Sequence, residues 1–163
     1  MLLHCSQLEK RLRLPDTFSK VKRSEIMARV RGQDTKPELV VRRLLHSMGY
    51  RFRLHRRDLP GSPDIVLPGY RKVVFVHGCF WHGHEECHRA ARPTSNAEFW
   101  NRKLDGNKRR DIETHQQLSS LGWQILVVWQ CQAKNTDVLR ERLQTFLRSE
   151  GESFGEDAAQ CQG

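Results

Sequence analysis

The sequence has no long hydrophobic run and no regular cysteine pattern. Its longest apolar run, residues 125–129, is far shorter than the roughly 18 residues that a membrane-spanning helix needs. Residues 1–6 lack the sustained apolar stretch of a secretory signal, so we expect a cytoplasmic protein if the chain is complete. Five cysteines at irregular spacing favour reduced thiols, some of them on a metal, over a disulfide framework.

What the chain has in excess is positive charge. Its 163 residues carry 28 Lys and Arg against 19 Asp and Glu, a formal net charge of +9. Residues 10–31 hold eight basic residues, whereas residues 149–163 hold four acids and no Lys or Arg. We expect one domain over 17–148, an N-terminal tail over 1–16 and a disordered acidic tail after the domain. The basic excess favours a nucleic-acid partner, with the basic segment acting either as a solvated arm or as a DNA contact.

The hydrophobic pattern changes period several times, as expected for a mixed α/β domain. Thr35 and Glu38 have capping-box spacing and Pro37 falls in the first turn, which predicts a helix over 36–48. The further predicted elements are a short helix over 24–31, strands over 50–55, 64–67 and 72–77, a long helix over 95–121 with a second capping signal at Ser95, a buried strand over 123–128 and a helix over 136–148. The first three strands suggest a β-meander, and residues 78–94 are predicted to form a long functional loop.

Residues 77–88 hold four of the eight histidines and two of the five cysteines. Thiolate and imidazole are the ligands that a structural zinc prefers, and it needs four of them. The predicted zinc ligands are Cys79, His84, Cys87 and Cys131. This spacing is not that of a standard zinc finger, and His88 can replace His84 or Cys87. Free thiols and surface histidines are the alternative interpretation.

His84 and His88 also match the zinc-protease pattern, with a glutamate between two histidines four residues apart. That mechanism requires a helix. Gly83 before the segment and Pro93 after it disfavour a helix here, and a peptidase has no evident use for the positive charge.

A second candidate site follows the Pro-Gly-Ser-Pro turn at 60–63, where Asp64 begins a predicted strand. A carboxylate in this place suits a hard cation such as Mg²⁺, which can activate water against a phosphodiester. The next predicted strand ends in His77, so the two residues can share one site. The alternative is that Asp64 only caps the turn.

A set of short runs in unbroken order resembles the very short patch repair endonucleases. These are Gly-Ser-Pro-Asp at 61–64, Phe-Val-His-Gly-Cys-Phe-Trp-His at 75–82, Glu-Phe-Trp at 98–100, Asn-Lys-Arg-Arg-Asp at 107–111 and Val-Trp-Gln-Cys at 128–131. The match covers about residues 20–147. It implies a restriction-endonuclease-like nuclease core, in which Phe75 and His77 stand where Glu and Lys are usual.

The resemblance implies a strand-specific, magnesium-dependent nick beside a T·G mismatch left by deamination of 5-methylcytosine. By the same resemblance, Asp64 and the main-chain carbonyl of Val76 bind Mg²⁺, and His77 and Glu38 hold metal-bound water and phosphate. His82 is the candidate general base, a role that suits imidazole near neutral pH. The capping box accounts for Glu38 equally well.

The resemblance also implies DNA contacts from several elements. Phe80 and Trp81 match an aromatic wedge inserted beside the mismatch, and Met27 matches a residue inserted from the N-terminal helix; such insertion is cheapest where base pairing is already poor. Lys103 and Asn107 would share one helix face and approach the mismatched bases. The alternatives are core packing for the aromatic residues and a hydrated surface for the helix.

Together these features predict an α/β protein with a restriction-endonuclease-like core, a central mixed β-sheet flanked by helices, and one structural zinc. Its expected partner is double-stranded DNA with a T·G mismatch, its expected state is a monomer, and mismatch-repair proteins are partners by analogy only. Two other functions stay open: a zinc-stapled DNA-binding module without catalysis, and a restriction enzyme of the same fold.

Overall fold

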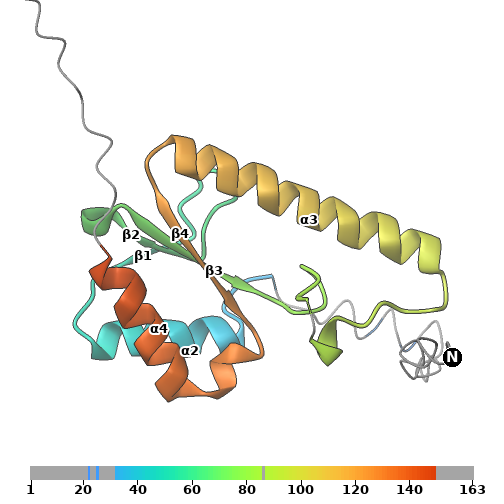
Figure 1. Cartoon of the computed structure of the whole chain (residues 1–163), viewed down its shortest axis with the longest axis horizontal. Helices are drawn as coiled ribbons and strands as arrows, with labels where there is room; N and C mark the ends of the chain where they lie inside the picture. The colour runs from blue at the N-terminus through green and yellow to red at the C-terminus, as the bar shows by residue number, and fades with distance from the viewer. Residues whose placement is uncertain (1–21, 23–24, 26–31, 86, 150–163) are drawn as a thin grey trace, which may run out of the picture.

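A computed structural model describes residues 22, 25, 32–85 and 87–149 of the chain (Figure 1). Its helices and strands are α2 (Lys36–Ser47), β1 (Arg53–Leu54), β2 (Ile65–Leu67), β3 (Lys72–His77), α3 (Ala97–Ser120), β4 (Gln124–Trp129) and α4 (Thr136–Arg148). Single 3₁₀ turns lie at Pro68–Tyr70, His88–Ala90 and Gln132–Lys134. Among the described helices, none is both long and apolar enough to cross a membrane.

The four strands form one mixed sheet in the order β1-β2-β3-β4. The pairs β1/β2 and β2/β3 are antiparallel, which confirms the predicted meander, and β4 pairs parallel with β3. Parallel neighbours need a long crossover connection, and here it is made by the loop after β3 together with α3. Because of this pairing, β3 and β4 both end at the same edge of the sheet.

Each face of the sheet is covered by helices. Along β3, Val74 faces a core formed with α2 and α4, whereas Val73 and Phe75 face a second core that includes Leu118 of α3. This alternation is the two-residue period of a strand buried on both sides. Figure 1 shows the result as three layers, with α2 and α4 on one side of the sheet and α3 on the other.

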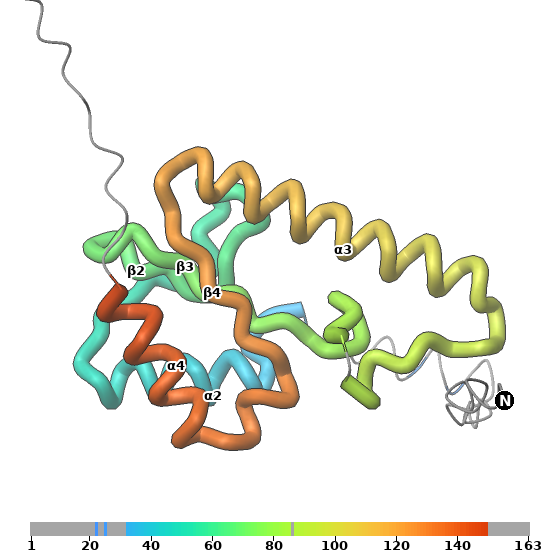
Figure 2. The backbone as a smooth tube through the Cα atoms, in the orientation of Figure 1, coloured from blue at the N-terminus to red at the C-terminus, as the bar shows by residue number. Residues whose placement is uncertain are grey.

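Helix α3 is much longer than the sheet that it crosses (Figure 2). Its C-terminal part packs on the sheet through Leu118, and its N-terminal part extends beyond the sheet, where Trp100 and Leu104 are buried. The loop after β3 runs alongside this extension (Figure 2). As predicted, the described residues of 78–94, which leave out residue 86, form a long irregular segment that contains the 3₁₀ turn at His88–Ala90.

The second capping signal was wrong. Helix α3 begins at Ala97, and its N-cap is Asn96 in the left-handed conformation with φ 52°, without a side-chain capping bond. With Asn96 as the cap, Glu98 occupies the second helical position instead of the third, so the Ser95 capping box cannot close. Asparagine is among the few residues that tolerate a left-handed backbone.

One predicted strand is much shorter than expected. The strand predicted over 50–55 is only the pair Arg53–Leu54, because the chain turns at His55, whose φ is 46°. The short helix predicted over 24–31 lies, apart from Glu25, outside the described residues. The same holds for Met27 and for the two predicted tails, except for Ser149.

Candidate active site and metal centre

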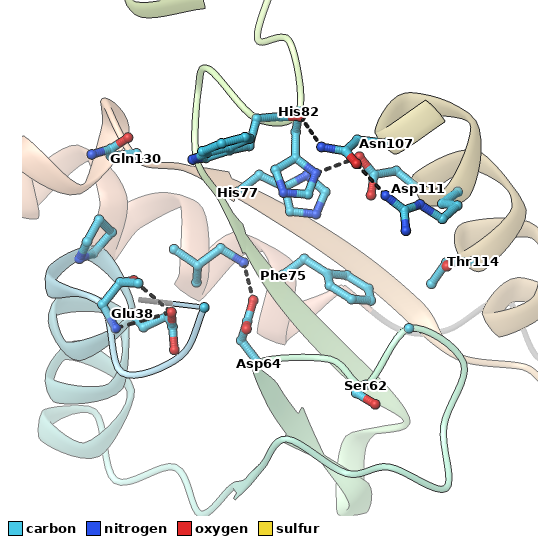
Figure 3. Close-up of a pocket in the computed structure, with 18 of the residues that line it drawn as sticks. Glu38, Ser62, Asp64, Phe75, His77, His82, Asn107, Asp111, Thr114 and Gln130 are labelled. Atoms are coloured by element: carbon cyan, nitrogen blue, oxygen red, sulfur yellow. Dashed lines mark hydrogen bonds and ion pairs between the residues drawn. The ribbon is translucent and has the colours of Figure 1, made fainter. Parts of the chain in front are cut away.

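A cavity of about 840 Å³ opens where β3 and β4 end, between the start of α2 and the middle of α3. Its walls include four residues that the sequence predicts to be catalytic: Glu38, Asp64, His77 and His82. In Figure 3, Glu38 and Asp111 lie on opposite sides of this cavity, with Asp64 and His77 between them. The fold therefore collects side chains from α2, β3, α3 and the turn before β2 around one space.

Asp64 is held directly by the neighbouring strand. Its Oδ2 accepts a hydrogen bond from the backbone N–H of Val76 at 2.7 Å (Figure 3). In an extended strand the N–H and C=O of one residue face the same side, so the Val76 carbonyl also faces Asp64. Burial raises the pKa of Asp64 to about 6; the Val76 N–H opposes this shift and the Glu38 carboxylate adds to it. A buried carboxylate with a second one nearby is a favourable place for a cation.

Glu38 is almost fully buried at the first turn of α2 and has several partners. Its Oε1 accepts hydrogen bonds from the backbone N–H and hydroxyl of Thr35, at 3.3 and 2.7 Å, which closes the predicted capping box. Its Oε2 accepts from the Asp34 N–H at 3.0 Å and from Arg42 at 2.9 Å. Glu38 thus caps the helix and faces the cavity at the same time.

A stack of imidazole rings forms another wall. The rings of His77 and His82 lie 3.9 Å apart and nearly parallel, and His115 of α3 lies 6.2 Å beyond His77. Burial, with a smaller contribution from His82, lowers the pKa of His77 to about 3, so His77 is neutral at physiological pH. Burial also lowers the pKa of His115.

His82 is oriented by a carboxylate that sequence reasoning left without a role. Its Nδ1 lies 2.7 Å from Oδ2 of Asp111 on α3. Burial disfavours ionisation of Asp111, but the His82 hydrogen bond and the nearby histidines outweigh it and lower its pKa. An ionised Asp111 accepts a hydrogen bond from the Nδ1–H of His82. In this tautomer Nε2 of His82 carries no proton and has a lone pair. His82 can therefore accept a proton at Nε2.

The predicted wedge residues belong to an aromatic cluster at the start of α3. The rings of Phe80 and Trp81 are edge-on at 5.1 Å, and both lie against the buried Trp100. Phe99, which is 48% exposed, extends the cluster outward, and the Lys103 ammonium lies 5.6 Å from the Trp81 ring centre. Phe80 and Trp81 are half-buried, so the loop presents them near the surface on a rigid base.

Asn107 has local partners on both sides of its amide. Its Nδ2 donates to the main-chain carbonyl of Trp81 at 2.9 Å, and its Oδ1 accepts from Arg110. The residue thus ties the loop to α3. Contact with bases, as the sequence predicts, requires these bonds to be exchanged for bonds to DNA.

The four predicted zinc ligands converge at one place. The donor atoms of Cys79, His84, Cys87 and Cys131 all lie within 4.8 Å of one another. The parallel register explains how Cys131 joins the loop, because His77 pairs with Trp129 and each cysteine follows two residues later. The His84 ring also stacks on Trp129 at 4.3 Å, which fixes its orientation.

The donor set fits a structural zinc. Tetrahedral bonds of about 2.0–2.3 Å place ligands about 3.3–3.8 Å apart, and the distance from Cys131 Sγ to His84 Nδ1 is 3.3 Å. Burial raises the pKa of the Cys79 thiol to about 11, whereas the Arg89 N–H lowers the pKa of Cys87. A divalent cation would compensate the cost of ionising Cys79, since coordination deprotonates a thiol.

Comparison with known proteins shows what this architecture is similar to. Residues 15–89 match the family model described as DNA mismatch endonuclease Vsr. Over 134 residues the chain is 48% identical to the type II nicking enzyme V.XorIIP of Xanthomonas oryzae pv. oryzae, covering 82% of this chain and 98% of that protein. It is 39% identical over 145 residues to DNA mismatch endonuclease Vsr of Escherichia coli K12, covering 86% and 92% of the two chains. The chain belongs to the Vsr family of DNA mismatch endonucleases.

Family membership confirms the resemblance and the predicted mismatch endonuclease function. Within this Vsr-family site, the structure adds residues that single motifs did not indicate. Asp111 lies in the quoted 107–111 run, but its role becomes evident only when α3 brings it to His82. His115 follows Asp111 by four residues, one helical turn. This spacing could have indicated from the sequence that both side chains lie on the same face of α3.

Proposed function

We propose that this Vsr-family endonuclease nicks the thymine-containing strand beside a T·G mismatch produced by deamination of 5-methylcytosine, by magnesium-dependent phosphodiester hydrolysis. The observation that carries the proposal is the single cavity that joins the Asp64 carboxylate to the His82–Asp111 pair. Metal-assisted hydrolysis needs a hard-cation ligand and a proton acceptor within reach of one phosphate. The names of the relatives, mismatch endonuclease and nicking enzyme, agree with this substrate and reaction.

The core is proposed to be restriction-endonuclease-like. A mixed sheet with helices on both faces supports this assignment. The position of Asp64, directly before β2 and beside the C-terminal end of β3, supports it as well.

Magnesium is proposed to bind Asp64 and the main-chain carbonyl of Val76. The Val76 N–H occupies Oδ2 of Asp64, so Oδ1 is the oxygen left for a cation. When bound, Mg²⁺ neutralises phosphate charge and makes a bound water more acidic. Glu38 and the neutral His77 line the same cavity and are proposed to orient water and phosphate.

His82 is proposed to remove the proton from the attacking water. Asp111 holds the proton on Nδ1, which directs the Nε2 lone pair to act as the acceptor. As His82 gains a proton, its new charge is stabilised by the adjacent Asp111 carboxylate. The water oxygen forms the new bond to phosphorus while the bond from phosphorus to the sugar oxygen breaks, and the displaced sugar oxygen takes up a proton from solvent.

Recognition of the mismatch is assigned to the aromatic cluster and α3. Phe80 and Trp81 are proposed to enter the weakened base stack, and Lys103 and Asn107 to contact the mismatched bases. The buried Trp100 behind the cluster supports this role, since a rigid base reduces the entropy lost on insertion. Met27, outside the described residues, is proposed to insert from the N-terminal helix.

Zinc is proposed as the structural metal on Cys79, His84, Cys87 and Cys131, where it would fix the loop that carries the wedge. We expect a monomer to suffice, because one nick needs one active site. A bacterial cytoplasmic location at the nucleoid follows from the proposed substrate, and partnership with mismatch-repair proteins is expected by analogy.

The proposal is tested with Asp64→Ala on duplexes labelled separately in each strand. We expect nicking to be lost while binding to T·G duplex stays within about tenfold of wild type. Asp58→Ala is the matched control, since Asp58 is exposed on the same segment and pairs with Arg56. Unchanged nicking by the Asp64 variant would refute the metal role. No nicking by wild-type protein would indicate a DNA-binding module, and cleavage of both strands of paired DNA a restriction enzyme.

A further inference from the structure

His55 belongs to none of the motifs that identify the family, yet it lies between two of the cavity's carboxylates. It follows β1 with a left-handed backbone, φ 46°, and its side chain is 18% exposed. A non-glycine residue in this conformation is uncommon and is held there by its surroundings.

The two ring nitrogens of His55 face different elements. Nε2 lies 3.0 Å from the guanidinium of Arg42 on α2, and Nδ1 lies 4.0 Å from Oδ1 of Asp64. Oδ1 is the Asp64 oxygen that the Val76 N–H does not use. The imidazole therefore bridges α2 and the free side of the Asp64 carboxylate.

Arg42 determines which nitrogen carries the proton. A guanidinium can only donate, so a hydrogen bond at 3.0 Å requires Nε2 of His55 to accept. The ring proton must then be on Nδ1, facing Asp64.

Arg42 is itself fixed by two acids. Its guanidinium donates to Oε2 of Glu38 at 2.9 Å and to Oδ1 of Asp34 at 2.5 Å, and its side chain is 11% exposed. A guanidinium held by several acceptors keeps a defined direction. The chain of contacts thus runs from the α2 capping box through Arg42 and His55 to Asp64.

We propose that His55, oriented by Arg42, is a positioning residue for the Asp64 carboxylate. It presents an N–H dipole to Oδ1 and keeps that oxygen aimed into the cavity. The inference rests on the proposed magnesium role of Asp64. Replacing a residue that orients a metal ligand commonly lowers metal affinity by about tenfold or more.

Two substitutions at His55 distinguish the contribution of Nδ1, which faces Asp64, from that of Nε2, which faces Arg42. In His55→Asn the amide nitrogen replaces Nδ1 and faces Asp64, and asparagine tolerates the left-handed backbone. In His55→Gln the amide reaches toward Arg42 and the donor to Asp64 is lost. His46→Gln, exposed on α2, is the matched histidine control.

Binding of Mn²⁺ alone to zinc-loaded protein, followed by electron paramagnetic resonance, gives a readout independent of turnover. We expect His55→Gln to weaken Mn²⁺ binding by about tenfold and His55→Asn by no more than about threefold. In nicking assays, raised Mg²⁺ should restore the rate of His55→Gln, because the defect is in metal affinity. Thermal melts report whether each variant is folded.

Asp64→Asn distinguishes failure of this inference from failure of the proposed function. If Asp64→Asn abolishes Mn²⁺ binding while His55→Gln binds as wild type does, the positioning role is overturned. Equal losses in His55→Gln and His55→Asn would overturn it too, because the donor facing Asp64 would then be irrelevant. If Asp64→Asn binds Mn²⁺ normally, the proposed metal role of Asp64 fails instead.

Discussion

Replacing Asp64 by asparagine is predicted to abolish nicking and to stabilise the magnesium-free protein. The folded structure raises the pKa of this carboxyl from 3.8 to about 6, chiefly by burial. The ionised form is therefore less stable in the folded protein than in the unfolded chain. A shift of about two units corresponds to about 3 kcal/mol, at about 1.4 kcal/mol for each unit.

The sign of the effect depends on pH. Below about pH 3 the carboxyl is protonated in both the folded and the unfolded state, so it does not affect the free energy of unfolding. As the pH rises from about 4 to 6, the unfolded chain ionises first, so the folded state loses relative stability. Above about pH 6 the full penalty is present. Asparagine cannot ionise and can still accept a hydrogen bond from the Val76 N–H. The substitution should therefore remove most of the ionisation penalty.

Urea unfolding of zinc-loaded protein without magnesium measures this difference. At pH 7.5 we expect Asp64→Asn to raise the free energy of unfolding by about 2–3 kcal/mol, and at pH 4 to leave it within about 0.5 kcal/mol of wild type. Added Mg²⁺ should stabilise wild type and not the variant, because a ligand stabilises the state that binds it. If the variant is less stable than wild type at pH 7.5, the buried Asp64 carboxylate does not destabilise the magnesium-free protein and this prediction is refuted.

Three further predictions concern other parts of the structure. Cys131→Ser should lose bound zinc and lower Tm by roughly 10 °C, and full zinc occupancy by metal analysis would contradict the assigned ligand set. Asp111→Asn should lower the single-turnover nicking rate by roughly 10²-fold with mismatch binding intact, since His82 loses its orienting acceptor; an unchanged rate would exclude that role. Lys72→Met should cost about 2 kcal/mol in urea unfolding relative to exposed Lys134→Met, because buried Lys72 donates to three carbonyls at the end of α4. Equal stability of these two variants would argue against it.

Local sequence signals predicted the fold where all the hydrogen bonds of a motif are made within the motif. The Thr35–Glu38 capping box closes within four residues, so the start of α2 was predictable. The same signal failed at Ser95, because there the chain enters α3 with Asn96 in a left-handed conformation. Arg92, which bonds to Asn101 and Asp105 across this junction, shows that contacts beyond the motif constrain the approach.

The candidate site was predictable where residues follow paired strands. The parallel register of β3 and β4 places Cys131 beside Cys79, and such pairing follows from two buried strands joined by a helix. Asp111 and His55 were not predictable in this way. No motif indicates what either residue does, because its role depends on which side chain lies opposite it in space.

The most direct test of the central claim is a denaturing-gel assay on a panel of duplexes labelled in each strand separately. The panel places T·G or C·G at the centre of candidate methylation sites and is run with Mg²⁺ and with chelator. We predict a Mg²⁺-dependent nick in the thymine strand of a mismatched duplex and no cleavage of its paired counterpart. If the protein binds the mismatch tightly but cleaves no duplex in the presence of Mg²⁺, the proposed nicking function is contradicted.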